Sequence, residues 1–173
     1  MIFPGGVRQF GFFVADLDAA IARWADLGVA PWFVMREVAM TGCHYRGQLS
    51  EPVISIALAN NGDMQVELVQ QHDDTPSIYK EFMDATGGGF NQVAYWVKDI
   101  DTVLGAALAA GWTEVWCGAA GARFSYLEHP DSPVPIVELV EDNDISGPMN
   151  AAVRAAADAW RPGEPVIQVV DLG

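Results

Sequence analysis

The 173-residue chain is poor in cysteine, in basic side chains and in long apolar runs, and each shortage excludes a class of protein. No apolar run approaches the roughly 20 residues that a membrane-spanning helix needs. Residues 1–6 lack the basic region and following apolar stretch that are typical of a secretory signal. We therefore expect a cytoplasmic protein that has no membrane partner.

Only nine lysine and arginine residues stand against 23 aspartate and glutamate residues, for a formal net charge of −14. The basic residues are scattered singly, so no stretch suits a phosphate backbone, and we expect no nucleic-acid partner. The two cysteines, Cys43 and Cys117, are far apart and outside any CxxC pattern. This spacing argues against a disulfide scaffold and against a thiolate metal site.

What the chain does have is an internal repeat. Residues 9–18 read QFGFFVADLD and residues 92–101 read QVAYWVKDID, so both follow Q-x-x-aromatic-aromatic-V-x-D-L/I-D. Each copy is typical of a strand that ends in an aspartate able to cap a following helix. A glycine lies 19 residues after each glutamine, at Gly28 and Gly111, where it can end that helix in the left-handed conformation.

Stretches with the pattern of β-strands follow both helices and predict three further strands in each half. The last of these strands repeats the letters VELV in both halves. The fold class is therefore α+β, built from two βαβββ modules. Module one covers residues 7–70, with strands after its helix at 32–38, 53–59 and 64–69, and module two covers 90–141, with strands at 114–117, 122–127 and 136–140.

The segments outside the modules contain two further predicted helices. The linker at residues 71–89 holds turn residues, a short helix around 77–86 and three consecutive glycines. The C-terminal segment at residues 146–173 holds an alanine-rich helix at 149–160 and a tail rich in proline and glycine. We expect that helix to support a homodimer, or alternatively to cover an open sheet edge of its own chain.

Two such modules, each with a glutamine in its first strand and a glutamate in its last, resemble the vicinal oxygen chelate superfamily, which includes glyoxalase I. The resemblance covers residues 7–141 and implies one domain at 1–145, with paired half-barrels around a central cavity. It also implies a divalent metal held by four side chains. Carried over by position, these ligands are Gln9, Glu67, Gln92 and Glu138.

The family most often has histidine at the first-strand positions, whereas both positions hold glutamine in this chain. Two carboxylates and two amide oxygens would make an all-oxygen site, which favours Mg, Mn or Ca over Zn or Cu. A metal-free site stays open as the alternative. In that case Gln9 and Gln92 would hydrogen-bond the glutamates or a substrate carbonyl.

Strand alternation indicates what else lines the cavity. Phe13 shares a strand face with Gln9, and Trp96 shares one with Gln92, so we expect both aromatic rings in the substrate pocket. His44 lies in the turn-like sequence CHYR, from which it could reach the pocket mouth. Two aromatic walls would suit an apolar, aromatic ligand.

The resemblance implies a lyase or isomerase that acts next to a carbonyl, with Glu67 or Glu138 as the catalytic base, because burial raises the pKa of a carboxyl toward neutrality. A non-catalytic small-molecule binder like the bleomycin-resistance proteins is the alternative. A ring-cleaving dioxygenase is the third, although its two histidine ligands are missing from the matching positions. The net charge and the scattered arginines favour a small, uncharged or weakly anionic aromatic carbonyl compound over glutathione or coenzyme A conjugates.

Overall fold

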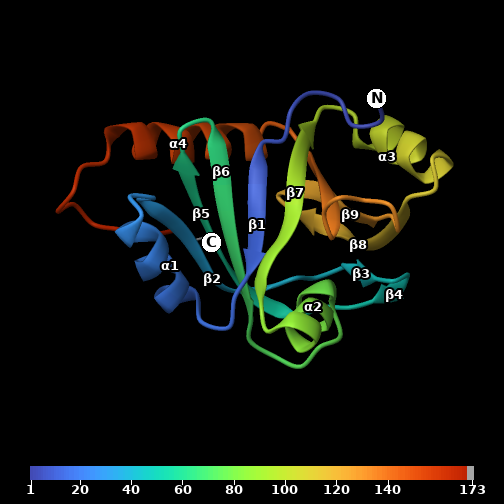
Figure 1. Cartoon of the computed structure of the whole chain (residues 1–173), viewed down its shortest axis with the longest axis horizontal. Coiled ribbons are helices and arrows are strands. Elements are labelled where there is room, and N and C mark those ends of the chain that lie inside the picture. The colour runs from blue at the N-terminus through green and yellow to red at the C-terminus, as the bar shows by residue number, and fades with distance from the viewer. Residues whose placement is uncertain (171–173) are drawn as a thin grey trace.

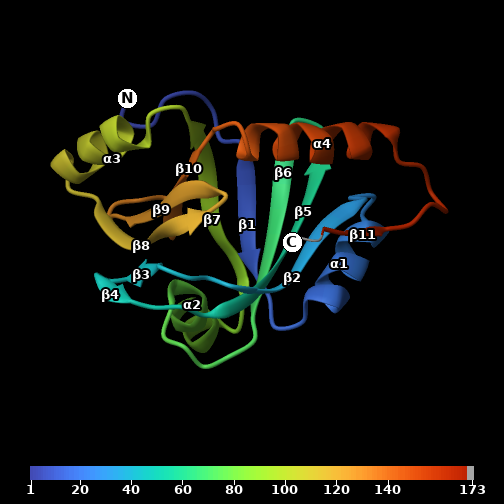
Figure 2. The same cartoon turned by 180° about the vertical axis from the view of Figure 1, so that it is seen from behind.

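The two halves of the sequence repeat form the two halves of one curved, unclosed sheet in the computed structural model, which describes residues 1–170 (Figures 1 and 2). Module one contains β1 (Gln9–Phe13), α1 (Leu17–Asp26), β2 (Trp32–Ala39), β5 (Val53–Asn61) and β6 (Met64–Gln71). Module two contains β7 (Gly89–Val97), α3 (Ile100–Ala109), β8 (Thr113–Ala120), β9 (Ala122–Glu128) and β10 (Ile136–Glu141). The predicted strand, helix and three-strand order is confirmed in both halves.

The helix ends follow the signals of the repeat. The side chain of Asp16 caps α1 by accepting a hydrogen bond from the Ala19 amide, and Asp99 caps α3 through the Thr102 amide. Gly28 and Gly111 follow the two helices with φ of 84° and 93°, a conformation that only glycine adopts at little cost. Equivalent local signals therefore give the two modules equivalent helices.

The modules join through their first strands. The strand order is β11-β2-β5-β6-β1-β7-β10-β9-β8-β3-β4, with β1 and β7 antiparallel at the centre. Helices α1 and α3 pack on the convex face, where their apolar sides bury two separate cores. A third core, which includes Phe13, Tyr79 and Trp116, fills part of the concave face. The concave side of the β1–β7 seam is therefore the position where residues of both modules meet.

Two helices outside the repeat bound the concave face at its opposite ends (Figure 1). The linker forms α2 (Ile78–Thr86), which is capped by Ser77, as predicted for residues 77–86. The C-terminal segment forms α4 (Ser146–Ala159), which starts three residues earlier than predicted and packs on β5 of its own chain. Among residues 1–170, no helix is both long enough and apolar enough to cross a membrane.

Three short strands were not anticipated from the sequence. Residues between β2 and β5 form a hairpin, β3 (His44–Tyr45) and β4 (Gln48–Leu49), and β3 pairs with β8 of the other module. Strand β11 (Ile167–Val169), in the tail, pairs with β2. Two- and three-residue strands carry too little periodicity to detect, and their hydrogen-bond partners lie far away in the sequence.

Candidate functional site

The register of the central strands brings the four predicted ligand residues to the seam. Across the antiparallel β1–β7 pair, Gln9 lies opposite Ala94 and Gln92 lies opposite Gly11, so the two modules are related by an approximate twofold axis. On the outer side of each strand, Gly11 is paired with Glu67 of β6 and Ala94 with Glu138 of β10. Each glutamate is thus separated from the other module's glutamine by one intervening strand.

The side chain of Gln92 connects the two glutamates. Its Nε2 donates hydrogen bonds to Oε2 of Glu67 and Oε2 of Glu138, both at 2.9 Å, and lies 2.8 Å from the hydroxyl of Tyr126. Gln92 is completely buried, and Glu138 is only 5% exposed. An amide nitrogen carries two hydrogens, so the oxygen atoms around it share them. The bridge partly compensates the burial of two acidic groups in one place.

The bridge depends on the absence of a side chain at Gly11. A Cβ atom at this position would lie 2.4 Å from Cδ of Gln92, far inside van der Waals contact. The twofold-related position is Ala94, which does carry a Cβ atom, and Gln9 has a different set of contacts. Its Nε2 donates to Oε1 of Gln65 at 2.8 Å. The two modules thus differ by one Cβ atom at this position, and their glutamines make different contacts.

Burial shifts the acidity of both glutamates in the same direction. It raises the pKa of Glu67 to about 7. The pKa of Glu138 is raised well above its ordinary value, chiefly by burial and then by the neighbouring charge of Glu67, while the hydrogen bond from Gln92 opposes the shift. Both shifts favour a proton on the pair near neutral pH, so that one carboxyl can act as an acid while the other acts as a base.

A pocket of about 480 Å³ opens above this pair. Both glutamates line it, and most of the remaining wall is apolar or aromatic, with the amides of Gln9, Gln65 and Asn150 at one side. Within the described part of the chain, no arginine, lysine or histidine lines this pocket. The other lining residues are Met35, Val38, Ala39, Met40, Thr41, Ile56, Leu58, Tyr79, Ala119, Ala120, Gly121, Ala122, Phe124, Tyr126, Val140, Ile145, Ser146 and Met149.

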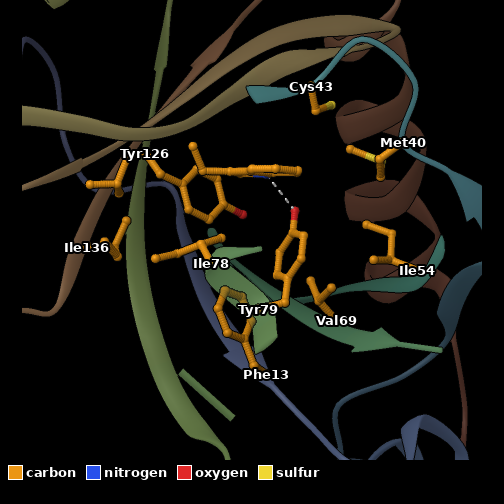
Figure 3. Close-up of a cluster of buried hydrophobic side chains, with 11 residues drawn as sticks. Phe13, Met40, Cys43, Ile54, Val69, Ile78, Tyr79, Tyr126 and Ile136 are labelled. Carbon is orange, nitrogen blue, oxygen red and sulfur yellow. Dashed lines mark hydrogen bonds between the residues drawn. The ribbon is translucent and has the colours of Figure 1, made fainter. Parts of the chain in front are cut away.

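Two tyrosines of the site were missed from the sequence. Figure 3 shows the hydroxyl groups of Tyr79, from α2, and Tyr126, from β9, pointing toward one another, and Trp116 Nε1 donates to the Tyr79 hydroxyl at 3.0 Å. Burial, followed by the charges of the two glutamates, raises the pKa of both tyrosines well above the ordinary value. Both are therefore neutral phenols. Tyr126 could have been found from strand pairing, because it lies directly opposite Glu138.

The structure does not place the three predicted pocket residues in the pocket. Phe13 is on the expected face, but α2 covers it, and its ring packs 4.9 Å from that of Tyr79. Trp96 is at the far end of β7, where the Arg8 guanidinium lies 5.2 Å from its ring centre. His44 is exposed on the hairpin, with its backbone paired to Cys117. Aromatic walls exist, but Tyr79, Phe124 and Tyr126 form them.

The oxygen atoms of the side chains at the seam are of the chemical type that binds a hard divalent cation. Residues 1–170 contain no cluster of three or more His, Cys, Asp or Glu arranged to hold a metal ion, so a site would need amide ligands. Oε1 of Gln9 and Oε1 of Gln92 are both buried and have no hydrogen-bond partner among the described residues. With the two carboxylates they make four side-chain oxygens of the type that Mg and Mn prefer. Nε2 of Gln92, and not its Oε1, faces the carboxylates, so the Gln92 amide would have to turn over to bind the same ion as the glutamates.

Paired βαβββ modules that share a seam and carry a pocket on its concave side define a glyoxalase-like fold. The family described as "Glyoxalase/Bleomycin resistance protein/Dioxygenase superfamily" matches residues 8–127, more than half of the chain. The protein belongs to this family, and the resemblance to the vicinal oxygen chelate superfamily is confirmed. No match was found among curated proteins.

Solved structures with the same fold include methylmalonyl-CoA epimerases. The enzyme from Mycobacterium tuberculosis is 25% identical, with a TM-score of 0.54 over 79% of this chain and 87% of that chain. A hypothetical protein from Bacillus halodurans C-125 is 19% identical, with a TM-score of 0.62 over 80% of this chain and 95% of that one. A Streptomyces coelicolor methylmalonyl-CoA epimerase variant bound to 2-nitronate-propionyl-CoA is 17% identical, with a TM-score of 0.51 over 81% and 96%.

Replacing Gly11 with alanine is expected to displace Gln92 and destabilise the protein. The added Cβ would overlap the Gln92 side chain, so the bridge to the glutamates would break, at a cost of roughly 1–3 kcal/mol. Urea unfolding at pH 7 measures this loss. The matched control is Gly105→Ala in α3, where an added Cβ meets open space and should stabilise by about 0.5–1 kcal/mol. Equal stability of Gly11→Ala and wild type would contradict the close contact.

The raised pKa of Glu67 predicts that the protein becomes less stable as the pH rises toward neutrality. The folded state holds the proton up to about pH 7, whereas the unfolded chain releases it near 4.5. The stabilisation is thus complete below about pH 4.5 and is lost as the pH passes through 7, by roughly 3 kcal/mol for Glu67 alone. Unfolding free energies measured from pH 4.5 to 8 should show this fall.

The double variant Glu67→Gln/Glu138→Gln should lose most of this pH dependence. Glu81→Gln is the control, because the ion pair with Arg46 lowers the pKa of Glu81 and moves its titration below this window. If the unfolding free energy of the double variant falls with pH as steeply as that of the wild type, the glutamates are not the source of the pH dependence.

Proposed function

We propose that this protein is an isomerase or lyase that transfers a proton at the carbon next to a carbonyl group of a small, uncharged, largely apolar substrate. The observation that carries this proposal is the pair of glutamates in an apolar pocket, Glu138 buried and Glu67 half-buried, with the pKa of Glu67 raised by desolvation to about 7. A carboxyl with this pKa is matched to proton abstraction and return at neutral pH. Membership of the glyoxalase-like family is consistent with such an activity.

The two glutamates have different roles in this reaction. Burial raises the pKa of both carboxyls, so one can take the substrate proton while the other carries a proton. We assign the base role to Glu67, whose pKa of about 7 suits proton transfer near neutral pH. Negative charge then develops on the substrate oxygen. Tyr126 stays neutral at the pocket wall, so its hydroxyl can donate a hydrogen bond to that oxygen. The apolar wall excludes water and keeps these interactions strong.

A divalent cation is the proposed cofactor, with Mg, Mn or Ca as candidates. Gln9, Glu67, Gln92 and Glu138 would hold it through the two carboxylates and the two amide oxygens that lack a hydrogen-bond partner within residues 1–170. Such an ion would supply electrostatic stabilisation of the charge on the substrate oxygen. In its absence, the same amides would serve as hydrogen-bonding groups for the glutamates and the substrate.

The proposed substrate differs from methylmalonyl-CoA, the compound after which the epimerase neighbours are named. Methylmalonyl-CoA carries a carboxylate and phosphate groups, whereas the only charged groups lining this pocket, in the described chain, are two glutamates. An anion would meet repulsion there with no compensating cation. The rings of Phe124, Tyr126 and Tyr79 favour an apolar or aromatic compound instead. The shape of the pocket would determine which apolar compounds of suitable size can bind.

Non-catalytic binding of a small molecule is the second candidate. It is favoured by the bridge itself, because Gln92 already occupies an acceptor atom of each glutamate. We do not propose ring cleavage: His72 bonds to Ser55, His44 and His129 lie on other surfaces, and none of the three lines the pocket. A homodimer remains a separate proposal that sedimentation can test.

The proposed activity predicts hydrogen exchange in neutral aryl ketones that have a C–H bond next to the carbonyl. With protein in D₂O, proton NMR should show loss of that signal faster than in buffer alone. Glu67→Gln should slow the exchange by about a hundredfold or more, and Glu138→Gln should also slow it. Glu128→Gln is the control, because Glu128 bonds to Arg46 on the surface. Unchanged exchange in both site variants would remove the enzymatic proposal in favour of binding.

The proposed cation site predicts that Mn²⁺ or Mg²⁺ raises the melting temperature of the wild-type protein. Binding to the folded state alone stabilises by about 2.7 kcal/mol when the ion is at a hundred times its Kd. Differential scanning fluorimetry and calorimetric titration measure the shift and the Kd. Glu67→Gln/Glu138→Gln should abolish both responses, and Glu51→Gln, an exposed surface change, should keep them. No response in the wild type would favour the metal-free site.

A further inference from the structure

Helix α4 is connected to the site through the amide side chains of Gln65 and Asn150, which are not part of the repeated sequence pattern. Nε2 of Gln9 donates to Oε1 of Gln65 at 2.8 Å, and Nε2 of Gln65 donates to Oδ1 of Asn150 at 3.2 Å. Gln65 is 1% exposed, and all three residues line the pocket. Asn150 belongs to α4, which follows the segment matched by the family.

This chain of hydrogen bonds has a direction. Asn150 offers an oxygen, so Gln65 turns its N–H groups toward α4 and its oxygen toward Gln9. Gln9 must then turn its own N–H groups toward Gln65. The oxygen at the other arm of the Gln9 amide is left buried and without a partner among residues 1–170. A buried acceptor without a donor is costly unless an occupant of the site satisfies it.

The second module has no equivalent of this chain. The position in β10 that corresponds to Gln65 is Ile136, whose side chain has no polar atom, and Gln92 instead bonds to the two glutamates. The two glutamines of the repeat thus have divided functions: Gln92 holds the glutamates together, and Gln9 carries an acceptor that is free for the occupant.

We propose that Gln65 and Asn150 are positioning residues, which hold the amide of Gln9 so that its oxygen faces the occupant of the site. Helix α4 is then part of the binding site and not only a cover for the sheet. The proposal rests on the proposed function for the identity of the occupant, which must accept electron density from that oxygen. A divalent cation and an N–H or O–H group of the substrate share this chemistry.

The test compares α4 variants of the full chain by two independent readouts. The first is ¹⁵N NMR of the side-chain NH₂ groups of Gln9 and Gln92, assigned through their loss in Gln9→Glu and Gln92→Glu. The second is affinity, for Mn²⁺ alone and for a neutral aryl ketone that carries a hydroxyl group, followed by tryptophan fluorescence. Trp116 is a suitable reporter because it bonds to Tyr79 at the pocket wall.

Asn150→Ala should shift the Gln9 signal, speed its hydrogen exchange and weaken one probe by about fivefold, the effect of one hydrogen bond. The Gln92 signal should not change. Asn150→Asp keeps the acceptor oxygen and should leave the Gln9 signal as in wild type. Arg154→Ala is the matched control, because it removes the ion pair between α4 and Asp63 without touching Gln65. Weakened Mn²⁺ binding would identify a cation as the partner of Gln9, and weakened ketone binding a substrate group.

Three results would overturn the proposal. The first is a Gln9 signal in Asn150→Ala that matches wild type. The second is an equal change in Arg154→Ala, since α4 would then act only as a cover. The third is an altered Gln9 signal with both affinities unchanged. If the wild type binds neither probe, the proposed function fails, whereas the amide signals still decide whether Asn150 positions Gln9.

Discussion

The arrangement of the site depends on two glutamates, Glu138 buried and Glu67 half-buried, that lie next to each other at the seam of the sheet. Two acidic groups in an apolar pocket repel one another and lose their hydration, so they require donors, a shared proton or a cation. Gln92 supplies the donors from a completely buried position, 2.9 Å from each carboxyl group. Its own position depends on Gly11, which leaves the space that a Cβ atom would fill. The same burial that costs stability raises the pKa of Glu67 to the range useful for proton transfer.

The approximate twofold symmetry of the fold does not extend to the chemistry of the site. Around the two glutamines the strand pairings of the two modules correspond, but the side chains at these positions differ. Gly11 corresponds to Ala94, Gln65 to Ile136 and Leu58 to Tyr126. These differences place the polar network of Gln92 and Tyr126 beside Glu138 and leave Gln9 in contact with the C-terminal helix. A duplicated scaffold has thereby produced one site with distinct groups on its two sides.

The pocket is completed by segments that do not belong to the repeat. Helix α2 contributes Tyr79, α4 contributes Met149 and Asn150, and the segment that leads to the hairpin contributes Met40 and Thr41. Because β3 of this hairpin pairs with β8, the first module also supports the wall formed by the second. The βαβββ modules thus position the reacting groups, and these additions determine the shape and polarity of the space above them. Selectivity within the family is expected to depend on such additions.

The sequence by itself determined the fold class, the helix ends and the positions of Gln9, Glu67, Gln92 and Glu138, because each follows from local signals that occur twice with matching spacing. Strand alternation also placed Phe13 on the correct face. Only the tertiary structure decided which residues reach the pocket, because α2 covers Phe13 and Trp96 lies beyond the seam beside Arg8. It alone brought Gln65 and Asn150 together at the site, since these residues are 85 positions apart in the sequence. Gln92 can reach both carboxyls because Gly11, its partner across the β1–β7 pair, has no Cβ atom. No pattern of residue types along the chain encodes the distance between these two residues.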